Sequence, residues 1–181
     1  MSTIVKGDLL RCNAHIIAHQ TNCVTRKPHG LSHKIADRWP CANIYAKRGG
    51  VTPNTASPKQ EGAPGTSVLI PTGDKTPIYV ACLLGQVCPG DGKSDYWCLR
   101  YNKPYNTDDT AARLIYFENA LADLDAQLPR SVEVKKPTIA FPYGIGCGLA
   151  GGDWTRYHAM IEAFAYKVCE KGWDVEIYQM T

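Results

Sequence analysis

The residues best suited to chemistry in this sequence form a glycine-rich stretch, FPYGIGCGLAGGDW, between Phe141 and Trp154. An apolar run typical of a buried strand, Pro137–Phe141, precedes it, and a helical pattern over Asp153–Lys171 follows it. Glycines let a ligand approach the backbone, and backbone N–H groups between a strand and a helix N-terminus attract anions. The stretch therefore predicts a phosphate or diphosphate site, with a flexible linker loop as the alternative.

Two common phosphate-binding motifs are missing from this stretch. The sequence has no GxxxxGK followed by Ser or Thr, which excludes the usual P-loop. GIGCGLAGG fits GxGxxG only loosely and lies too near the C-terminus for a dinucleotide-binding fold to follow it. If the stretch binds phosphate, it does so in another structural setting.

The cysteines and histidines do not form a recognisable metal site. None of the eight cysteines belongs to a CxxC pair, so we expect neither structural zinc nor a disulfide framework. His29 and His33 have helical spacing but no evident partner ligands. We therefore expect no metal ion and no cofactor.

Positive charge is concentrated in one segment, although the net charge of the chain is only +3. Six basic residues and a single acid, Asp37, lie between Arg26 and Arg48. The segment is interpreted either as a solvated helix face or as a surface that steers an anionic ligand. A dedicated nucleic-acid-binding module is a third possibility, which the modest net charge does not favour.

Strand and helix patterns interleave along the 181 residues, which predicts one α/β domain, residues 1–181, with a mixed sheet. The expected strands are Ser2–Lys6, His15–His19, Thr66–Ile70, Pro77–Leu84, Pro137–Phe141 and Trp173–Tyr178. The expected helices are Leu31–Trp39, Cys41–Lys47, a third from Thr107 to Leu128 with Asp108 and Asp109 in its first turn, and Asp153–Lys171. The third and fourth of these strands, Thr66–Ile70 and Pro77–Leu84, flank a Gly73-Asp74 turn and are expected to form a hairpin.

The chain shows no signal peptide and no apolar run long enough to span a membrane, so we expect an intracellular protein, cytoplasmic or nuclear, and a monomer. The polar segment from Gly85 to Asn106 is long enough to suggest a function or an insertion. In α/β sheets, ligands bind beyond the carboxyl ends of the strands. Three loops are expected to meet there: Asp8–Leu9, Gln20–Gly30 and Pro142–Gly152.

Five short segments, in order, resemble the macrodomain family of ADP-ribose-binding modules. They are Val5–Leu9 (VKGDL), Ala18–Asn22 (AHQTN), His29–Ser32 (HGLS) with the following helix, the glycine-rich stretch, and the ending Val175–Met180. The sequence IGCGL within the glycine-rich stretch resembles the subclass that contains the terminal ADP-ribose protein glycohydrolase. The ending Val175–Met180 is similar to the closing strand of that subclass and of the yeast ADP-ribose 1″-phosphate phosphatase. The resemblance covers nearly the whole chain and implies a three-layer α/β/α sandwich with a mixed, mostly parallel sheet of about six strands.

The resemblance also implies a role for individual residues. Asp8 would accept a hydrogen bond from the adenine amino group, with Tyr178 beside the adenine, although Asp8 could be only a turn residue. Asn22 would bind the distal ribose, and Gly30 would let the chain pass close to it. The other residues that the resemblance assigns to ligand binding are Leu9, Leu31, Gln86, Gly144, Ile145, Gly146, Cys147, Gly148 and Leu149, and the segment from Gly144 to Gly148 would hold the diphosphate.

The catalytic pair of the related glycohydrolase, a lysine and an aspartate, does not carry over. The lysine position falls near Gln86, and the aspartate position is Ala150. His19 and Asp153 remain as candidate general bases that activate water, with helix capping as a second interpretation of Asp153. Thiol chemistry is disfavoured because no cysteine begins a Cys-x5-Arg loop.

The resemblance therefore implies a protein that binds ADP-ribose and hydrolyses an ADP-ribose derivative. The substrate would be ADP-ribose 1″-phosphate or an ADP-ribosyl group on a macromolecule. A reader that binds ADP-ribose without turnover is the alternative. Loss of the lysine–aspartate pair favours the reader, and the sequence does not separate the two.

Overall fold

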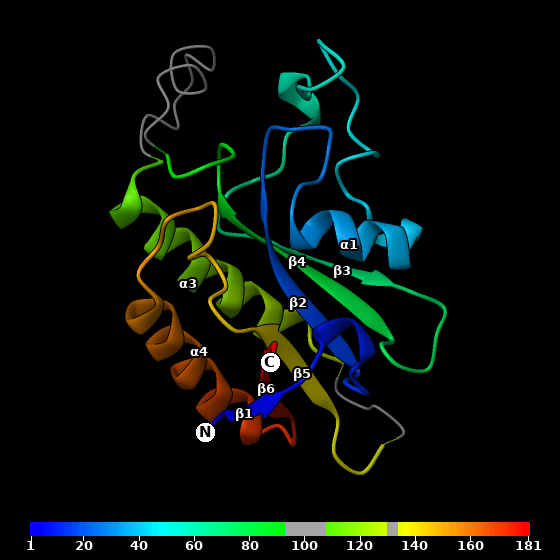
Figure 1. The fold of residues 1–181 in the computed structure, drawn as a ribbon, viewed down its shortest axis with the longest axis vertical. Coiled ribbons are helices and arrows are strands. Elements are labelled where there is room, and N and C mark those ends of the chain that lie inside the picture. Colours follow the sequence, from blue (N-terminus) through cyan, green and yellow to red (C-terminus); the bar gives the residue numbers. More distant parts are fainter. Residues whose placement is uncertain (93–107, 130–133) are drawn as a thin grey trace.

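The structure, a computed structural model, describes residues 1–92, 108–129 and 134–181. A six-stranded sheet with the order β1-β6-β5-β2-β4-β3 forms the centre of the molecule (Figure 1). Every neighbouring pair is parallel except β3 and β4, which form the expected antiparallel hairpin. The strands are β1 (Thr3–Lys6), β2 (Ile16–Asn22), β3 (Ser67–Pro71), β4 (Tyr79–Gln86), β5 (Thr138–Pro142) and β6 (Asp174–Gln179).

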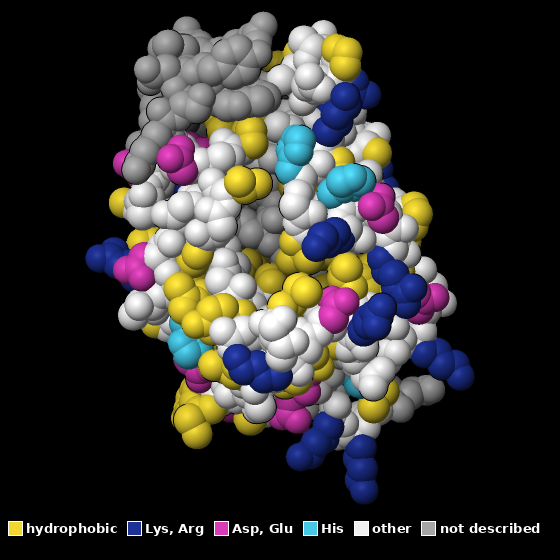
Figure 2. Space-filling view, viewed as in Figure 1, with side chains coloured by type: hydrophobic (Ala, Val, Ile, Leu, Met, Phe, Trp, Pro, Cys, Tyr) yellow, Lys and Arg dark blue, Asp and Glu magenta, His cyan; other side chains and the backbone are white. Residues whose placement is uncertain are grey.

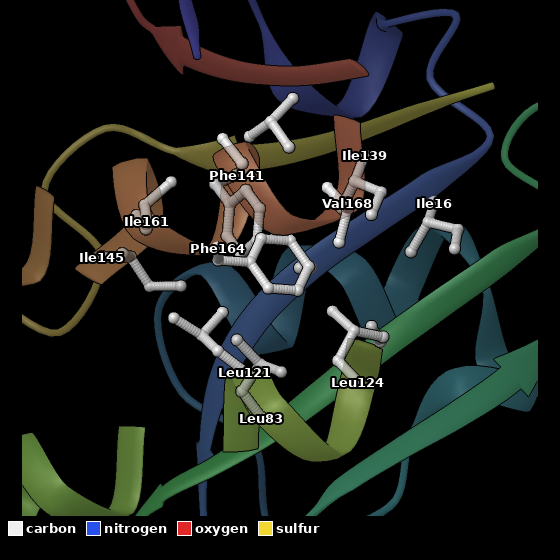
Figure 3. Close-up of a cluster of buried hydrophobic side chains, with 14 of the residues drawn as sticks. Ile16, Leu83, Leu121, Leu124, Ile139, Phe141, Ile145, Ile161, Phe164 and Val168 are labelled. Atoms are coloured by element: carbon white, nitrogen blue, oxygen red, sulfur yellow. The ribbon is translucent and has the colours of Figure 1, made fainter. Parts of the chain in front are cut away.

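Helices cover both faces of this sheet, which confirms the expected three-layer α/β/α architecture. Helix α1 (Leu31–Arg38) packs on one face, and α3 (Thr110–Gln127) and α4 (Trp154–Cys169) pack on the other (Figure 1). Side chains alternate along β2, so that Ile16 and Ala18 join the α3–α4 core while Ile17 faces the α1 core. The larger core, drawn in Figure 3, joins β5 to the two helices through side chains such as Phe141, Leu121 and Phe164.

The central strand is longer than its apolar pattern predicted. We expected it to end at His19, but β2 continues through Gln20 and Thr21 to Asn22, which pairs with Gln86 on β4 after a shift in register. Partners for the polar residues permit this extension, because the Thr21 hydroxyl donates to the Leu83 carbonyl at 3.3 Å. The extension places Asn22 at the carboxyl end of the sheet.

The helix expected over Cys41–Lys47 is absent, and this prediction was wrong. A 3-10 turn, Pro40–Ala42, takes its place and is followed by turns. The Asn43 side chain accepts a hydrogen bond from the Ala46 N–H at 3.2 Å, and such local bonds compete with helix formation.

The start of α3 also differs from the prediction, which placed both Asp108 and Asp109 in its first turn. Asp109 is the N-cap, and Asp108 lies outside the helix, buried and paired with Arg113 at 2.7 Å. Asp108 also accepts hydrogen bonds from the N–H groups of Val87 and Cys88, both at 2.8 Å. The predicted first helical residue, Thr107, lies outside the described residues, as does most of the loop predicted from Gly85 to Asn106.

Two further observations bear on the chemistry of the chain. The seven cysteines in the described part of the chain are all free, and Cys98 lies outside it. None of the described helices is both long and apolar enough to cross a membrane.

Candidate functional site

A cleft of about 470 Å³ opens beyond the carboxyl ends of β2, β4 and β5. Its walls come from the end of β2, the N-terminus of α1, the segment after β4 and the glycine loop, which we define as residues 143–152. Figure 2 shows the corresponding face of the molecule, which is hollowed near its centre. Two of the three loops expected to meet do so here, those of residues 20–30 and 142–152.

The glycine loop has backbone N–H groups without acceptors among the described residues, on residues that line this cleft. Internal bonds hold its shape, among them Cys147 N–H to Gly144 O at 2.9 Å and Gly152 N–H to Gly146 O at 2.9 Å. Five other N–H groups of the loop, all on residues that line the cleft, have no hydrogen-bond acceptor in the described part of the chain: those of Gly144, Gly146, Gly148, Leu149 and Ala150. Successive unpaired N–H groups in a concave backbone segment form an anion site.

Contact with α4 fixes the loop. Gly146 has φ +75°, and a Cβ there would lie 2.4 Å from the ring of Tyr157. A Cβ at Gly152 would meet the Gly146 carbonyl oxygen at 2.5 Å. Both residues must therefore be glycine for the loop to pack against Tyr157. Gly148 differs, because a Cβ there meets nothing within 4 Å.

The helix dipole that faces the cleft belongs to α1, whereas the sequence had suggested α4. The N-terminus of α4 is capped by Asp153, whose Oδ1 accepts from the Thr155 N–H at 2.9 Å, and Asp153 does not line the cleft. The N-terminus of α1 begins after Gly30, which has φ +56° and no side-chain cap. Gly30 and Leu31 line the cleft, so an uncapped helix end opens into it.

Asn22 reaches the cleft with a rigidly held side chain. Its Oδ1 accepts from the N–H groups of Val24 and Thr25 and from the Thr25 hydroxyl, at 2.9 to 3.1 Å. Its backbone carbonyl accepts from the buried Arg48 guanidinium at 2.7 Å. Its Nδ2 has no acceptor among the described residues, which leaves an oriented amide donor for a ligand.

His19 lies at the floor of the cleft, 3% exposed. Its Nδ1 lies 3.0 Å from the Ser32 hydroxyl oxygen, and its Nε2 lies 3.3 Å from the Cys82 sulfur. Burial lowers the pKa of the imidazole from 6.5 to about 4, so the ring is neutral at pH 7.

The residues assigned to adenine line a second hollow of about 650 Å³. Asp8 and Tyr178 line it together with Arg11 and Glu176. Leu9 is buried in the core beneath it. The two hollows are linked through the backbone, because the Tyr143 N–H donates to the Tyr178 carbonyl at 2.8 Å.

The predicted lysine and aspartate positions of the related glycohydrolase both fall in the cleft wall. Gln86 accepts from the Gln20 amide at 2.7 Å and donates to the Cys88 carbonyl at 2.9 Å, and Ala150 offers only a methyl group. Lysine, arginine, aspartate and glutamate are all absent from the described residues that line the cleft. The titratable side chains that do line it are His19, His29, Tyr45 and Tyr143.

Cys147 belongs to the glycine loop but is not among the described residues that line the cleft. Its Sγ lies 3.3 Å from the Ile145 carbonyl, and burial raises the pKa of the thiol to about 11. Such a thiol is protonated at pH 7 and is a poor nucleophile. In the described part of the chain no three His, Cys, Asp or Glu side chains group as metal ligands would.

Sequence reasoning gave no binding or catalytic role to several side chains that line the cleft, among them Ser32, Tyr45 and His29, the last of which was considered only as a metal ligand. Ser32 follows Gly30 at the start of a predicted helix, where a small polar residue is ordinary. Tyr45 lay in a segment predicted to be helical, so its position could not be anticipated.

The buried state of His19 predicts a dependence of stability on pH. The unfolded chain takes up a proton near pH 6.5, whereas folded His19 resists protonation down to about pH 4. The contribution of neutral, buried His19 to the free energy of unfolding is therefore complete above pH 6.5 and is lost as the pH falls toward 4. Relative to a His19→Asn variant, whose side chain can still accept from Ser32, the parent should lose about 2 kcal/mol of unfolding free energy between pH 7 and pH 5. Urea titrations at both pH values measure this, and a constant difference would contradict it.

Comparison with known proteins identifies the fold. No protein-family model and no curated protein matches the sequence. Among solved structures, the macrodomain of Mycobacterium tuberculosis DarG superposes with a TM-score of 0.69 at 20% identity, covering 98% of this chain and 97% of that chain. The macrodomain of Thermus aquaticus DarG gives 0.67 at 19%, covering 99% and 98%. A Trypanosoma brucei macrodomain in complex with ADP-ribose gives 0.59 at 11%, covering 98% of this chain and 62% of that chain. The chain therefore has the macrodomain fold.

Proposed function

We propose that this protein binds ADP-ribose and hydrolyses an ADP-ribose derivative, either ADP-ribose 1″-phosphate or an ADP-ribosyl group on a macromolecule. The observation that carries the proposal is the set of five N–H groups of the glycine loop that have no acceptor among the described residues and belong to residues that line the same cleft as the uncapped end of α1. No carboxylate on the described lining competes for these donors, so they suit a diphosphate. The resemblance in fold to a macrodomain solved with ADP-ribose supports this ligand.

The rest of the ligand fits along the two hollows. The diphosphate lies on residues 144–148, and the distal ribose lies between Gly30 and the free amide donor of Asn22. The adenine extends toward Asp8 and Tyr178 in the second hollow, where the Tyr178 hydroxyl donates to Glu176 at 2.9 Å. A carboxylate such as Asp8 can accept a hydrogen bond from the exocyclic amine of adenine.

Hydrolysis in this cleft uses water and not a lysine adduct. Gln86 has no basic nitrogen and Ala150 cannot accept a proton, so we assign the role of general base to a histidine. His19 is our candidate for the general base, because it lines the same cleft as Asn22, the last residue of β2. Asp153 was the other candidate, and its exposed carboxylate caps α4 away from the described lining.

A reader without turnover is the second candidate function, and the absence of charged side chains from the described lining favours it. A hydrolase and a reader differ in whether a reaction product is formed. Incubation with ADP-ribose 1″-phosphate and with an ADP-ribosylated protein should release phosphate or free ADP-ribose from at least one of them. Turnover of neither, together with tight binding of ADP-ribose, would establish the reader. A protein–ADP-ribose adduct trapped by borohydride would contradict the water mechanism.

The nucleic-acid-binding interpretation loses part of its support. Arg48 is 6% exposed and donates to the carbonyls of Thr25 and Asn22. Arg26 donates to the Arg48 carbonyl at 2.7 Å. Two of the six cations in this segment therefore hold the wall of the cleft, and the other four are exposed.

Gly148 offers the sharpest test of diphosphate binding. A side chain there meets open space and no strained backbone, so Gly148→Val should fold normally. Its isopropyl group would occupy the space above the loop and should weaken ADP-ribose binding on the order of 10- to 100-fold, the loss of one or more hydrogen bonds to a charged group. Calorimetric titration measures the affinity. Gly148→Ala is the matched control with a smaller loss, and equal melting temperatures confirm folding. Unchanged affinity in Gly148→Val would exclude this placement.

A further inference from the structure

A chain of hydrogen bonds joins the cleft to His19, and it begins at a side chain that the proposed mechanism has not used. Both ring nitrogens of His19 are engaged, Nδ1 with Ser32 and Nε2 with Cys82. No nitrogen of the ring is therefore free to bind a water molecule in the cleft directly. If His19 is the base, the proton must reach it through one of these partners.

Cys82 decides which nitrogen of His19 can accept a proton. The Cys82 thiol can donate to the Ala42 carbonyl oxygen, which lies 3.9 Å from the sulfur and can only accept, and we assign the S–H to this contact. The sulfur then offers a lone pair to His19, and Nε2 must carry the hydrogen that fills the 3.3 Å contact. In a neutral imidazole the other nitrogen, Nδ1, is then the acceptor. The base nitrogen therefore points at Ser32.

Ser32 connects this nitrogen to the cleft. With Nδ1 as acceptor at 3.0 Å, the Ser32 hydroxyl must be the donor, and one of its oxygen lone pairs remains available beside the one that accepts from Tyr45. Ser32 lies in the first turn of α1 and lines the cleft next to Gly30 and Leu31. Tyr45 also contacts it, because the Tyr45 hydroxyl hydrogen-bonds to Ser32 and accepts the Asn22 N–H at 3.3 Å.

We propose that Ser32 is the catalytic residue that passes the proton of the attacking water to His19, an inference that rests on the proposed hydrolysis of an ADP-ribose derivative. The Ser32 oxygen takes a proton from the water as its own proton moves to His19 Nδ1. The water oxygen bonds to the anomeric carbon of the distal ribose, and the bond from that carbon to the leaving oxygen breaks. The leaving oxygen takes up a proton from solvent, and His19 later returns one to solvent, so atoms and charge balance.

The weak basicity of buried His19 suits this sequence of events. With a pKa near 4, His19 does not deprotonate free water, and it does not hold a proton at rest. A water molecule becomes strongly acidic only as its oxygen bonds to an electron-poor carbon, and at that point a weak base is sufficient. Ser32, His19 and Cys82 form the proposed proton relay. The register of the sheet holds this relay in place, because His19 on β2 and Cys82 on β4 are direct neighbours.

The test compares Ser32→Ala with Ser32→Thr on the substrate that the parent turns over. Loss of the hydroxyl should lower kcat by about 10²- to 10⁴-fold, the usual contribution of a proton-transfer group. KM and the calorimetric affinity for ADP-ribose should stay within about twofold of the parent, since the N–H donors and Asn22 are untouched. Ser32→Thr keeps a hydroxyl and should restore most of kcat.

Ser67→Ala is the matched control, because it removes another buried serine hydroxyl, one on β3 that contacts Asp123 outside the cleft. It should change stability without changing kcat. A second readout is the solvent isotope effect on kcat, which in the parent should report two protons in flight and in Ser32→Ala at most one. A purely structural role of Ser32 would not change that number.

Each outcome bears on the proposal. Full kcat in folded Ser32→Ala overturns the relay, and so does a loss confined to ADP-ribose affinity. A parent that binds ADP-ribose but hydrolyses neither type of substrate also overturns it, while the binding function stands. A parent that does not bind ADP-ribose at all refutes the proposed function itself.

Discussion

Unpaired backbone donors in the glycine loop are the constraint on which the site depends. None of the five N–H groups has an acceptor in the described part of the chain, so each needs water or a ligand as its partner. The need is greatest at the half-buried residues Gly144, Gly146 and Ala150, because Gly148 and Leu149 are exposed to solvent. The loop cannot relax to pair them internally, because Gly146 and Gly152 pack directly against Tyr157 on α4. The donors are therefore held ready for an anion before it arrives, which lowers the cost of binding.

Buried cations support the walls of the cleft from behind without entering it. Arg113, paired with Asp108, donates to the Gly90 carbonyl at 2.6 Å and to the Ala150 carbonyl at 3.3 Å, and so joins the segment after β4 to the glycine loop. Arg48 does the same for the turn after Asn22. These guanidinium groups bind carbonyl groups and, for Arg113, Asp108, and they do not line the cleft. The described lining therefore has no Lys, Arg, Asp or Glu side chain, and the field of the α1 terminus would act on an anionic ligand with little competition.

The sequence predicted what depends on local pattern and missed what depends on packing. The strands, the β3–β4 hairpin and the glycine loop follow from apolar runs and from glycine spacing, which are local signals. The sequence offered helix capping as one of two interpretations of Asp153, and the structure has it as the N-cap of α4. That the uncapped end of α1 opens into the cleft could not be predicted from the sequence, because it depends on how α1 packs against the sheet. The roles of Ser32 and Cys82 depend on β2–β4 register and on the way α1 packs, which are properties of the folded chain.

The central claim, that the N–H groups of the glycine loop receive a diphosphate, is tested most directly by amide NMR during titration with ADP-ribose. The account predicts that the amide resonances of the loop, from Gly144 to Ala150, shift downfield together in proportion to occupancy, as hydrogen bonds to an anion form. Inorganic pyrophosphate at higher concentration should shift the same resonances. Binding of ADP-ribose that leaves these amides unchanged while others shift, such as those along the groove between α3 and α4, would contradict the account.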